Sequence, residues 1–308
     1  MKETASDAAR AQYRGRFAPS PTGPLHLGSL IAAVGSYLEA RSRGGEWLVR
    51  IEDVDTPRVV PGAADAILRA LEGCGLHWDS AIVYQSTRAD AYHAALHELK
   101  QRGLVYPCAC SRREIADSAA SGIEGHVYPG TCRAGIPPGR KARALRIDTT
   151  GAHVSFNDAL QGAVAQHLDT DIGDFVLYRA DGLFAYQLAV VIDDAEQGVT
   201  DIVRGADLLE STPRQIYIQT MLGLSRPRYM HLPVAVNEEG EKLSKQTHAA
   251  PIDHAHPVTA LVNALRFLGH DPPGAFLAAE PGVVLQWAAE SWRIERIPRT
   301  RRLVAPPL

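Results

Sequence analysis

The sequence of 308 residues lacks the marks of several protein classes. It has no uninterrupted apolar run of about 18 residues, which a membrane-spanning helix needs. Its first 12 residues have no apolar core of the kind found in signal peptides. Its 32 basic and 35 acidic side chains nearly balance, which excludes a uniformly basic nucleic-acid-binding protein. We therefore expect a cytoplasmic protein without membrane contact, whose contact with any nucleic acid is a local patch.

Two common nucleotide-binding signatures are also missing. The sequence contains neither a G-x-x-x-x-G-K-[ST] loop nor a G-x-G-x-x-G fingerprint. Their absence gives no support to a P-loop NTPase or a dinucleotide-dependent dehydrogenase. Internal repeats and low-complexity tracts are missing as well, so a repeat architecture is not indicated.

Apolar periodicity predicts alternating strands and helices in most of the chain. Apolar residues recur at helical spacing after Leu25 until Gly44 ends the pattern. We predict strands at 13–18, 47–51, 82–84, 174–179, 202–203 and 229–236, helices at 63–71, 89–102 and 207–222, and an apolar segment at 183–192. This alternation is typical of an α/β fold with a parallel sheet covered by helices.

The alternation stops near Pro107, which suggests an insertion. Three of the four cysteines and five glycines lie between 108 and 143. We divide the chain into a loose tail (1–12), a first α/β half (13–107), the insertion (108–170), a second half (171–250) and a helical C-terminal segment (251–308).

Two short segments could bind phosphates. HLGS at 26–29 begins a predicted helix, where free N–H groups and the positive dipole end attract anions. His26 could donate to phosphate oxygens, and Gly28 would let a flat base or phosphate approach the backbone. KLSK at 242–245 places Lys242 and Lys245 in one loop, where they could clamp a triphosphate. Taken alone, a structural histidine and a solvated charged turn are the favoured explanations of these segments.

The order of four motifs changes that balance. The motifs follow one another along the chain in this order: RFAPSPTG at 16–23 with LHLGS at 25–29, WLVRIEDVDTPR at 47–58, GVTDIVRGAD at 198–207 and KLSK at 242–245. Together they resemble the class I aminoacyl-tRNA synthetases of the glutamyl type, including the motifs named "HIGH" and "KMSKS". Leu27, Ser29, Leu243 and Gln246 depart from those motif names. The resemblance implies a ligase with a Rossmann-like catalytic domain that binds ATP.

The resemblance also implies a set of site residues. His26 and Lys245 would be the catalytic ligands of the ATP phosphates, with Gly28, Ser29 and Lys242 also binding ATP. The glutamate pocket would contain Arg16, Phe17, Ala18, Pro19, Ser20, Glu52, Tyr186 and Arg204. Arginine forks suit the two carboxylates of glutamate, and a glutamate side chain suits its ammonium. Ion pairing at strand ends is the alternative for Arg16 and Glu52. Asp193 and Asp194 could hold Mg²⁺ with ATP or lie in a solvated turn.

The cysteine cluster indicates a metal site. Four cysteines in a chain of this length do not make a disulfide scaffold. Cys108, Cys110 and Cys132 would give three soft ligands to one structural zinc ion. Histidine is the usual fourth ligand, which points to His126, whereas the family resemblance points to Tyr128. Three unrelated reduced cysteines remain the alternative, and Cys74 is interpreted as a buried apolar residue.

The resemblance is strongest to a short branch of this family that has no anticodon-binding domain. It implies transfer of L-glutamate to the queuosine base of tRNA(Asp) by a monomer. Alternatives are a truncated enzyme that charges tRNA(Glu), another nucleotidyltransferase of this fold, and a non-catalytic protein that binds glutamate or RNA. Two clusters could contact RNA phosphates or be solvated surface: Arg133, Arg140, Lys141, Arg143 and Arg146, and Arg293, Arg296, Arg299, Arg301 and Arg302.

Overall fold

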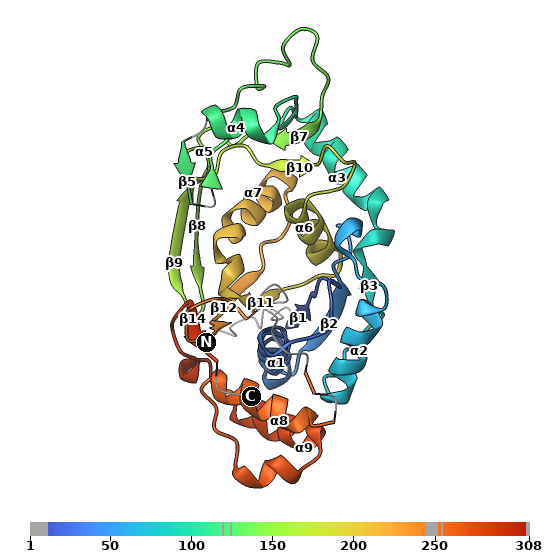
Figure 1. Cartoon of the computed structure of the whole chain (residues 1–308), viewed down its shortest axis with the longest axis vertical. Helices are drawn as coiled ribbons and strands as arrows, with labels where there is room; N and C mark the ends of the chain where they lie inside the picture. The colour runs from blue at the N-terminus through green and yellow to red at the C-terminus, as the bar shows by residue number, and fades with distance from the viewer. Residues whose placement is uncertain (1–11, 119, 124, 244–251, 254, 306–308) are drawn as a thin grey trace, which may run out of the picture.

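The structure is a computed structural model that describes residues 12–305, except 119, 124, 244–251 and 254. Figure 1 shows an elongated molecule. The cysteine-bearing insertion lies at one end, the parallel strands lie in the middle and the C-terminal helices lie at the other end. The tail expected at 1–12 falls almost wholly outside the described residues.

The first α/β half follows the predicted alternation closely. Its strands β1, β2 and β3 pair in parallel in that order. The elements are β1 (Arg14–Phe17), α1 (Leu27–Ser42), β2 (Glu46–Ile51), α2 (Ala63–Gly73), β3 (Val83–Tyr84) and α3 (Ala89–Gln101). The expected parallel sheet with helical crossovers is therefore confirmed for this half of the fold.

The second half places further parallel strands beside β1. The backbone N–H of Thr200 donates to the carbonyl of Arg14 at 2.9 Å, which brings β11 next to β1. The elements are β10 (Val176–Tyr178), α6 (Tyr186–Glu196), β11 (Asp201–Gly205), α7 (Thr212–Leu222), β12 (Arg228–Leu232) and β13 (Val234–Val236). The prediction of one strand over 229–236 is wrong, because β12 ends and β13 begins around Pro233, which has no N–H to donate.

The insertion contains more β-structure than expected. Its elements are β4 (Val105–Cys108), α4 (Arg112–Ser118), β5 (Ser121–Gly122), β6 (Gly125–His126), β7 (Ala144–Ile147), β8 (His153–Asp158), β9 (Gly162–His167) and α5 (Leu168–Asp171). The antiparallel hairpin β8–β9 has no counterpart in the predicted elements. It runs along one side of the molecule, from the cysteine-bearing end towards β12 and β14 (Figure 1).

The C-terminal segment is helical with one addition. α8 (Pro257–Phe267) and α9 (Pro281–Ser291) pack on α1, while β14 (Arg302–Val304) pairs in parallel with β13. The prediction of a wholly helical segment is therefore incomplete. A fully buried stripe on α1 explains the packing, since Leu30 and Leu38 lie in one core with Leu261 and Leu265. Each such side chain contributes about 1.5–3 kcal/mol by leaving water.

Candidate active site and metal centre

One pocket lies at the carboxyl ends of β1, β2 and β11, where parallel α/β sheets commonly bind ligands. It brings together every described residue that the family resemblance implied for ATP and glutamate binding. These residues are Arg16, Phe17, Ala18, Pro19, Ser20, His26, Gly28, Ser29, Glu52, Tyr186, Arg204 and Lys242. Lys245, the other proposed phosphate ligand, lies outside the described residues.

The first turn of α1 forms one wall of this pocket. His26 is the N-cap: its Nδ1 accepts from the Ser29 N–H at 3.4 Å, and its Nε2 lies 3.1 Å from Ser29 Oγ. A Cβ added to Gly28 would lie 3.2 Å from the carbonyl oxygen of Leu243. The absence of that Cβ therefore lets the lysine loop approach the helix start closely.

The described part of the lysine loop carries an ion pair. The Lys242 ammonium donates to the Asp207 carboxylate, and both residues line the pocket. Asp207 was not among the predicted site residues, although it ends the GVTDIVRGAD motif. Half of the Lys242 side chain is exposed, so a phosphate entering from solvent could compete with this carboxylate.

Arg16 is held by a carboxylate of the protein. Its Nε and Nη2 donate to the two oxygens of Asp194 at 3.0 and 3.2 Å, and both side chains are buried. The ion-pairing alternative for Arg16 is thus part of the structure, with Asp194 as the partner. Because Arg16 also lines the pocket, this pair fixes a positive charge at its wall.

The interpretation of Asp193 and Asp194 as a solvated turn is wrong, and their protein contacts give no support to a Mg²⁺ site. Both residues lie in α6 and are buried. Asp193 accepts hydrogen bonds from Gln85, Arg88 and Tyr92. Asp194 accepts from Arg16 and Arg50. Protein donors therefore occupy the carboxylate oxygens that a metal would need.

Glu52 adds a carboxylate to the pocket, and Tyr186 adds a phenol hydroxyl. Glu52 is buried, and its nearest cation is Arg50 Nη2 at 3.3 Å. Burial raises the pKa of Glu52, and the charges of Arg50 and Arg16 oppose this increase. Burial, followed by the Glu52 carboxylate, raises the pKa of Tyr186 to about 12. Tyr186 therefore keeps its proton and can donate a hydrogen bond to a bound ligand.

Arg204 presents one nitrogen without a partner. This buried guanidinium donates from Nε to His231 Nε2 at 3.1 Å and from Nη2 to Thr212 Oγ1 and Gln215 Oε1, both at 2.8 Å. Its Nη1 is buried and has no hydrogen-bond partner among the described residues. A buried unpaired donor is costly, so this nitrogen is suited to an anionic ligand in the pocket.

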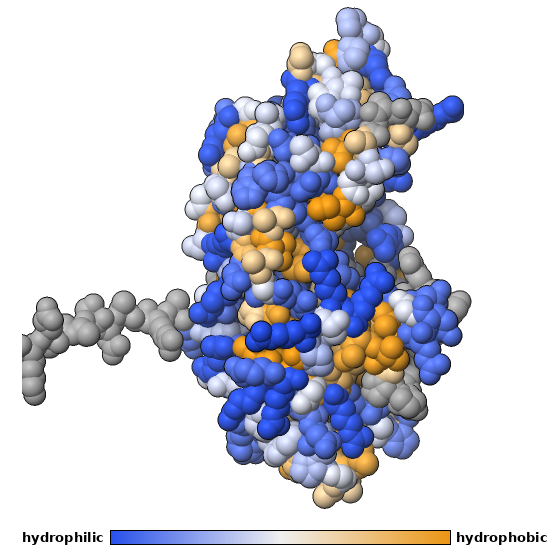
Figure 2. Space-filling view, turned by 90° about the vertical axis from the view of Figure 1, so that its left-hand side faces the viewer, coloured by the Kyte–Doolittle hydropathy of each residue, from blue (hydrophilic) through white to orange (hydrophobic). Residues whose placement is uncertain are grey.

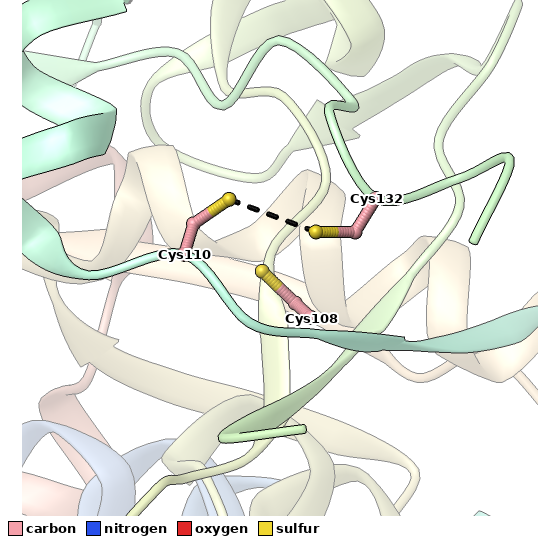
Figure 3. A group of neighbouring side chains, drawn as sticks. All are labelled: Cys108, Cys110 and Cys132. Atoms are coloured by element: carbon pink, nitrogen blue, oxygen red, sulfur yellow. Dashed lines mark hydrogen bonds between the residues drawn. The ribbon is translucent and has the colours of Figure 1, made fainter. Parts of the chain in front are cut away.

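The three cysteines of the insertion converge as the sequence suggested. Figure 3 shows their sulfurs pointing towards one another, Cys108 and Cys110 from one segment and Cys132 from another. All three sulfurs lie within 4.8 Å of one another, and Cys110 Sγ is 3.6 Å from Cys132 Sγ. Zn–S bonds of about 2.3 Å in a tetrahedron separate sulfurs by about 3.8 Å. The cluster could therefore hold one zinc ion.

Tyr128 is the better placed of the two candidates for the fourth ligand. Its hydroxyl lies 3.3 Å from Cys108 Sγ and 3.6 Å from Cys110 Sγ, and it accepts the Cys132 N–H at 3.0 Å. His126 is exposed on β6 and is absent from the group of described ligands that could share an ion. Cys74 is buried and remote from this cluster, as predicted.

Comparison with known proteins settles the family. The family model described as "tRNA synthetases class I (E and Q), catalytic domain" matches residues 12–277. The chain belongs to this family. It is 60% identical over 296 residues to the glutamyl-Q tRNA(Asp) synthetase of Dechloromonas aromatica (strain RCB), covering 96% of this chain and 98% of that relative. It is 55% identical over 300 residues to the enzyme of that name from Aromatoleum aromaticum, covering 97% and 95%.

A solved structure of this family confirms the expected fold. The crystal structure of the glutamate-tRNA synthetase from Elizabethkingia anophelis superposes with a TM-score of 0.77 at 25% identity. The match covers 94% of this chain and 67% of that one. The predicted α/β fold of a class I catalytic domain and the ligase class are therefore confirmed.

The two basic clusters of this synthetase differ in how many of their charges are paired. In the insertion, Arg133 binds Asp174, Arg140 binds Glu114, and Arg146 is buried over the ring of Tyr128. The two other basic residues of this cluster, Lys141 and Arg143, are exposed. The C-terminal arginines are all exposed, and one of them, Arg301, pairs with Glu210 at 2.8 Å. These residues are Arg293, Arg296, Arg299, Arg301 and Arg302. The C-terminal cluster therefore offers more accessible positive charge than the insertion.

Proposed function

We propose that this synthetase activates L-glutamate with ATP and transfers the glutamyl group to the queuosine base of tRNA(Asp). The observation that carries the proposal is that one pocket contains both the residues proposed to bind glutamate and the described residues proposed to bind the ATP phosphates. The names of relatives that match along nearly their full lengths support the choice of acceptor.

The buried half of the pocket fits an amino acid with an acidic side chain. Glu52 would bind the ammonium, while Arg204 Nη1 and the charge of Arg16 would face carboxylates. Tyr186 would donate its hydroxyl. Glutamine would leave part of this cationic site unpaired, which can discriminate strongly against it.

The other half of the pocket would hold ATP. A carboxylate oxygen of glutamate attacks the α-phosphorus, the bond from that phosphorus to the bridging oxygen breaks, and pyrophosphate leaves. His26, Lys242 and Lys245, with Mg²⁺ accompanying ATP, would stabilise the charge that develops on the phosphates. A nucleophile of the tRNA base then attacks the activated carbonyl, and AMP leaves.

A zinc ion bound by Cys108, Cys110, Cys132 and Tyr128 would fix the shape of the insertion. The donor set suits this metal, because three sulfurs and a phenol oxygen already converge. The ion would have a structural role, since the cluster does not line the pocket.

The acceptor is tested by supplying labelled glutamate and ATP with tRNA(Asp) that carries queuosine, tRNA(Asp) without queuosine, and tRNA(Glu). Label should appear on queuosine-containing tRNA(Asp) alone. Label confined to tRNA(Glu) would instead identify an enzyme that charges the 3′ end, an alternative favoured by the structural likeness to glutamate-tRNA synthetase. Absence of glutamate-dependent ATP–pyrophosphate exchange would favour a non-catalytic binding protein.

A further inference from the structure

We propose that Asp158 and His231 are positioning residues that hold the Arg204 guanidinium in the orientation that receives glutamate. The inference rests on the proposed function for its substrate. The three side chains form a buried chain of hydrogen bonds that ends at the pocket. They come from the end of β8, from β12 and from β11.

The link between His231 and Arg204 requires one protonation state. The guanidinium Nε–H can only donate, so His231 Nε2, at 3.1 Å, must accept. Thr212 Oγ1 also lies 3.1 Å from this nitrogen, but the Thr212 hydroxyl can donate its proton to the Leu208 carbonyl instead. His231 must therefore be neutral and carry its proton on Nδ1.

Asp158 selects that protonation state. Its Oδ2 lies 2.6 Å from His231 Nδ1 and accepts the proton carried there. Its Oδ1 is fixed by the backbone N–H groups of Leu160, Gln161 and His231, at 3.0, 2.9 and 3.1 Å. Because three donors hold Oδ1 in place, the other oxygen cannot turn away from the imidazole.

The chain of hydrogen bonds determines which part of Arg204 faces the ligand. With Nε held by His231, and Nη2 held by Thr212 and Gln215, the guanidinium plane has little freedom. Nη1 is the one nitrogen of this group that lacks a described protein acceptor. Fixed donors of this kind bind a carboxylate without the cost of ordering a mobile side chain.

Asp158→Asn tests the chain of hydrogen bonds, because it replaces a carboxylate oxygen with an amide nitrogen and changes few other atoms. Its Oδ1 should stay with the three backbone donors, which places the new amide N–H against His231 Nδ1. The imidazole proton must then move to Nε2, where it faces the Arg204 Nε–H. We expect the KM for glutamate in pyrophosphate exchange to rise about 10- to 100-fold, while the KM for ATP stays near its wild-type value.

Three variants at two histidines separate positioning from general stability. His231→Gln places an oxygen that can accept from Arg204, so it should restore glutamate affinity relative to His231→Leu. His270→Gln is the matched control, because His270 is also buried but, among the described residues, bonds only the backbone groups of Leu268 and Arg293. It should leave the KM for glutamate unchanged.

Nitrogen-15 NMR of the wild-type imidazole gives an independent readout. Protonation of His231 at Nδ1 and not at Nε2 is the expected state, with the signal assigned by its disappearance in His231→Gln. Protonation at Nε2, or an unchanged glutamate KM in Asp158→Asn, would overturn the proposal. If wild-type protein neither exchanges pyrophosphate nor binds glutamate in calorimetry, the proposed function fails, and NMR still tests the chain of hydrogen bonds.

Discussion

At the scale of single residues, the partners of the pocket side chains differ from what their sequence neighbours suggest. Asp193 and Asp194 look like a metal-binding or solvent-exposed pair in the sequence. In α6 they are buried and neutralised by arginines from other elements. A buried charge must be paired to be tolerated, so these aspartates hold Arg16 and Arg88 in place.

Folding stability should depend on the protonation of His231. Burial, only partly opposed by Asp158, lowers its pKa to about 4, whereas an unfolded histidine titrates near 6.5. Between about pH 4 and 6.5 the unfolded state binds more protons than the folded state. The free energy of unfolding therefore decreases as the pH falls through this range. The loss should be on the order of 3 kcal/mol.

Urea unfolding at several pH values measures this loss. Arg204 and Asp207 also influence the titration of His231, so the comparison uses His231→Gln, which keeps both. The variant should show a shallower dependence over the same range. An equally steep dependence in the variant would assign the effect to other groups.

Lys245 should be essential for activation although it lies outside the described residues. Its charge would act on phosphates in the transition state, where electrostatic stabilisation contributes most. Lys245→Ala should slow glutamate-dependent pyrophosphate exchange by orders of magnitude. Glu238→Ala, an exposed change in the preceding turn, is the control, and near-normal exchange in Lys245→Ala would remove this role.

At the scale of elements, strands and helices with strong local patterns were the easiest to predict. The strands around Trp47 and Ile202 and the helix from Ala63 agree with the predicted ranges to within a few residues. The hairpin β8–β9 was missed, although His153–Asp158 alternates between exposed and buried positions. The strand β14 was missed because three residues carry almost no periodicity, and their pairing partner is remote in the sequence.

Removal of zinc should loosen the insertion and leave amino acid activation intact. Cys110→Ala deletes one thiolate of the cluster, and a structural site contributes its binding energy to folding. Elemental analysis should find about one zinc per wild-type chain and much less in the variant, with a lower melting temperature. Pyrophosphate exchange should persist, since the cluster lies outside the pocket.

The control for this experiment is Cys74→Ala, which removes a buried cysteine outside the cluster. It should retain the metal. A wild-type protein purified without chelator and found free of zinc would refute the metal site.

At the scale of the whole molecule, charge is distributed in local patches on a nearly neutral protein. Figure 2 shows that the face bearing β9 and β14 is largely hydrophilic, with separate small apolar patches. Across the part of the chain that the structure describes, no helix has the length and apolar character to cross a membrane. Because the positive and negative charges of the whole molecule nearly balance, RNA binding should depend on local clusters of arginines.

The C-terminal arginines provide the clearest test of that dependence. Neutralising a phosphate releases counterions, so tRNA binding weakens with salt in proportion to the number of phosphates bound. Arg299→Ala with Arg302→Ala should reduce the slope of log affinity against log salt by about 0.7–0.9 for every phosphate that the variant no longer binds. Arg69→Ala, an exposed change on α2, should leave the slope unchanged, and an unchanged slope in the double variant would exclude this cluster.

The sequence by itself determined the α/β class, the family and twelve of the residues that line the pocket, because most of these features lie in short contiguous motifs. Tertiary structure alone decided how these residues are held. Asp194 meets Arg16, Asp207 meets Lys242, and Asp158 reaches Arg204 through His231. Such pairs join elements far apart in the sequence, and neither periodicity nor spacing encodes a contact that forms only when separate elements pack and exclude water.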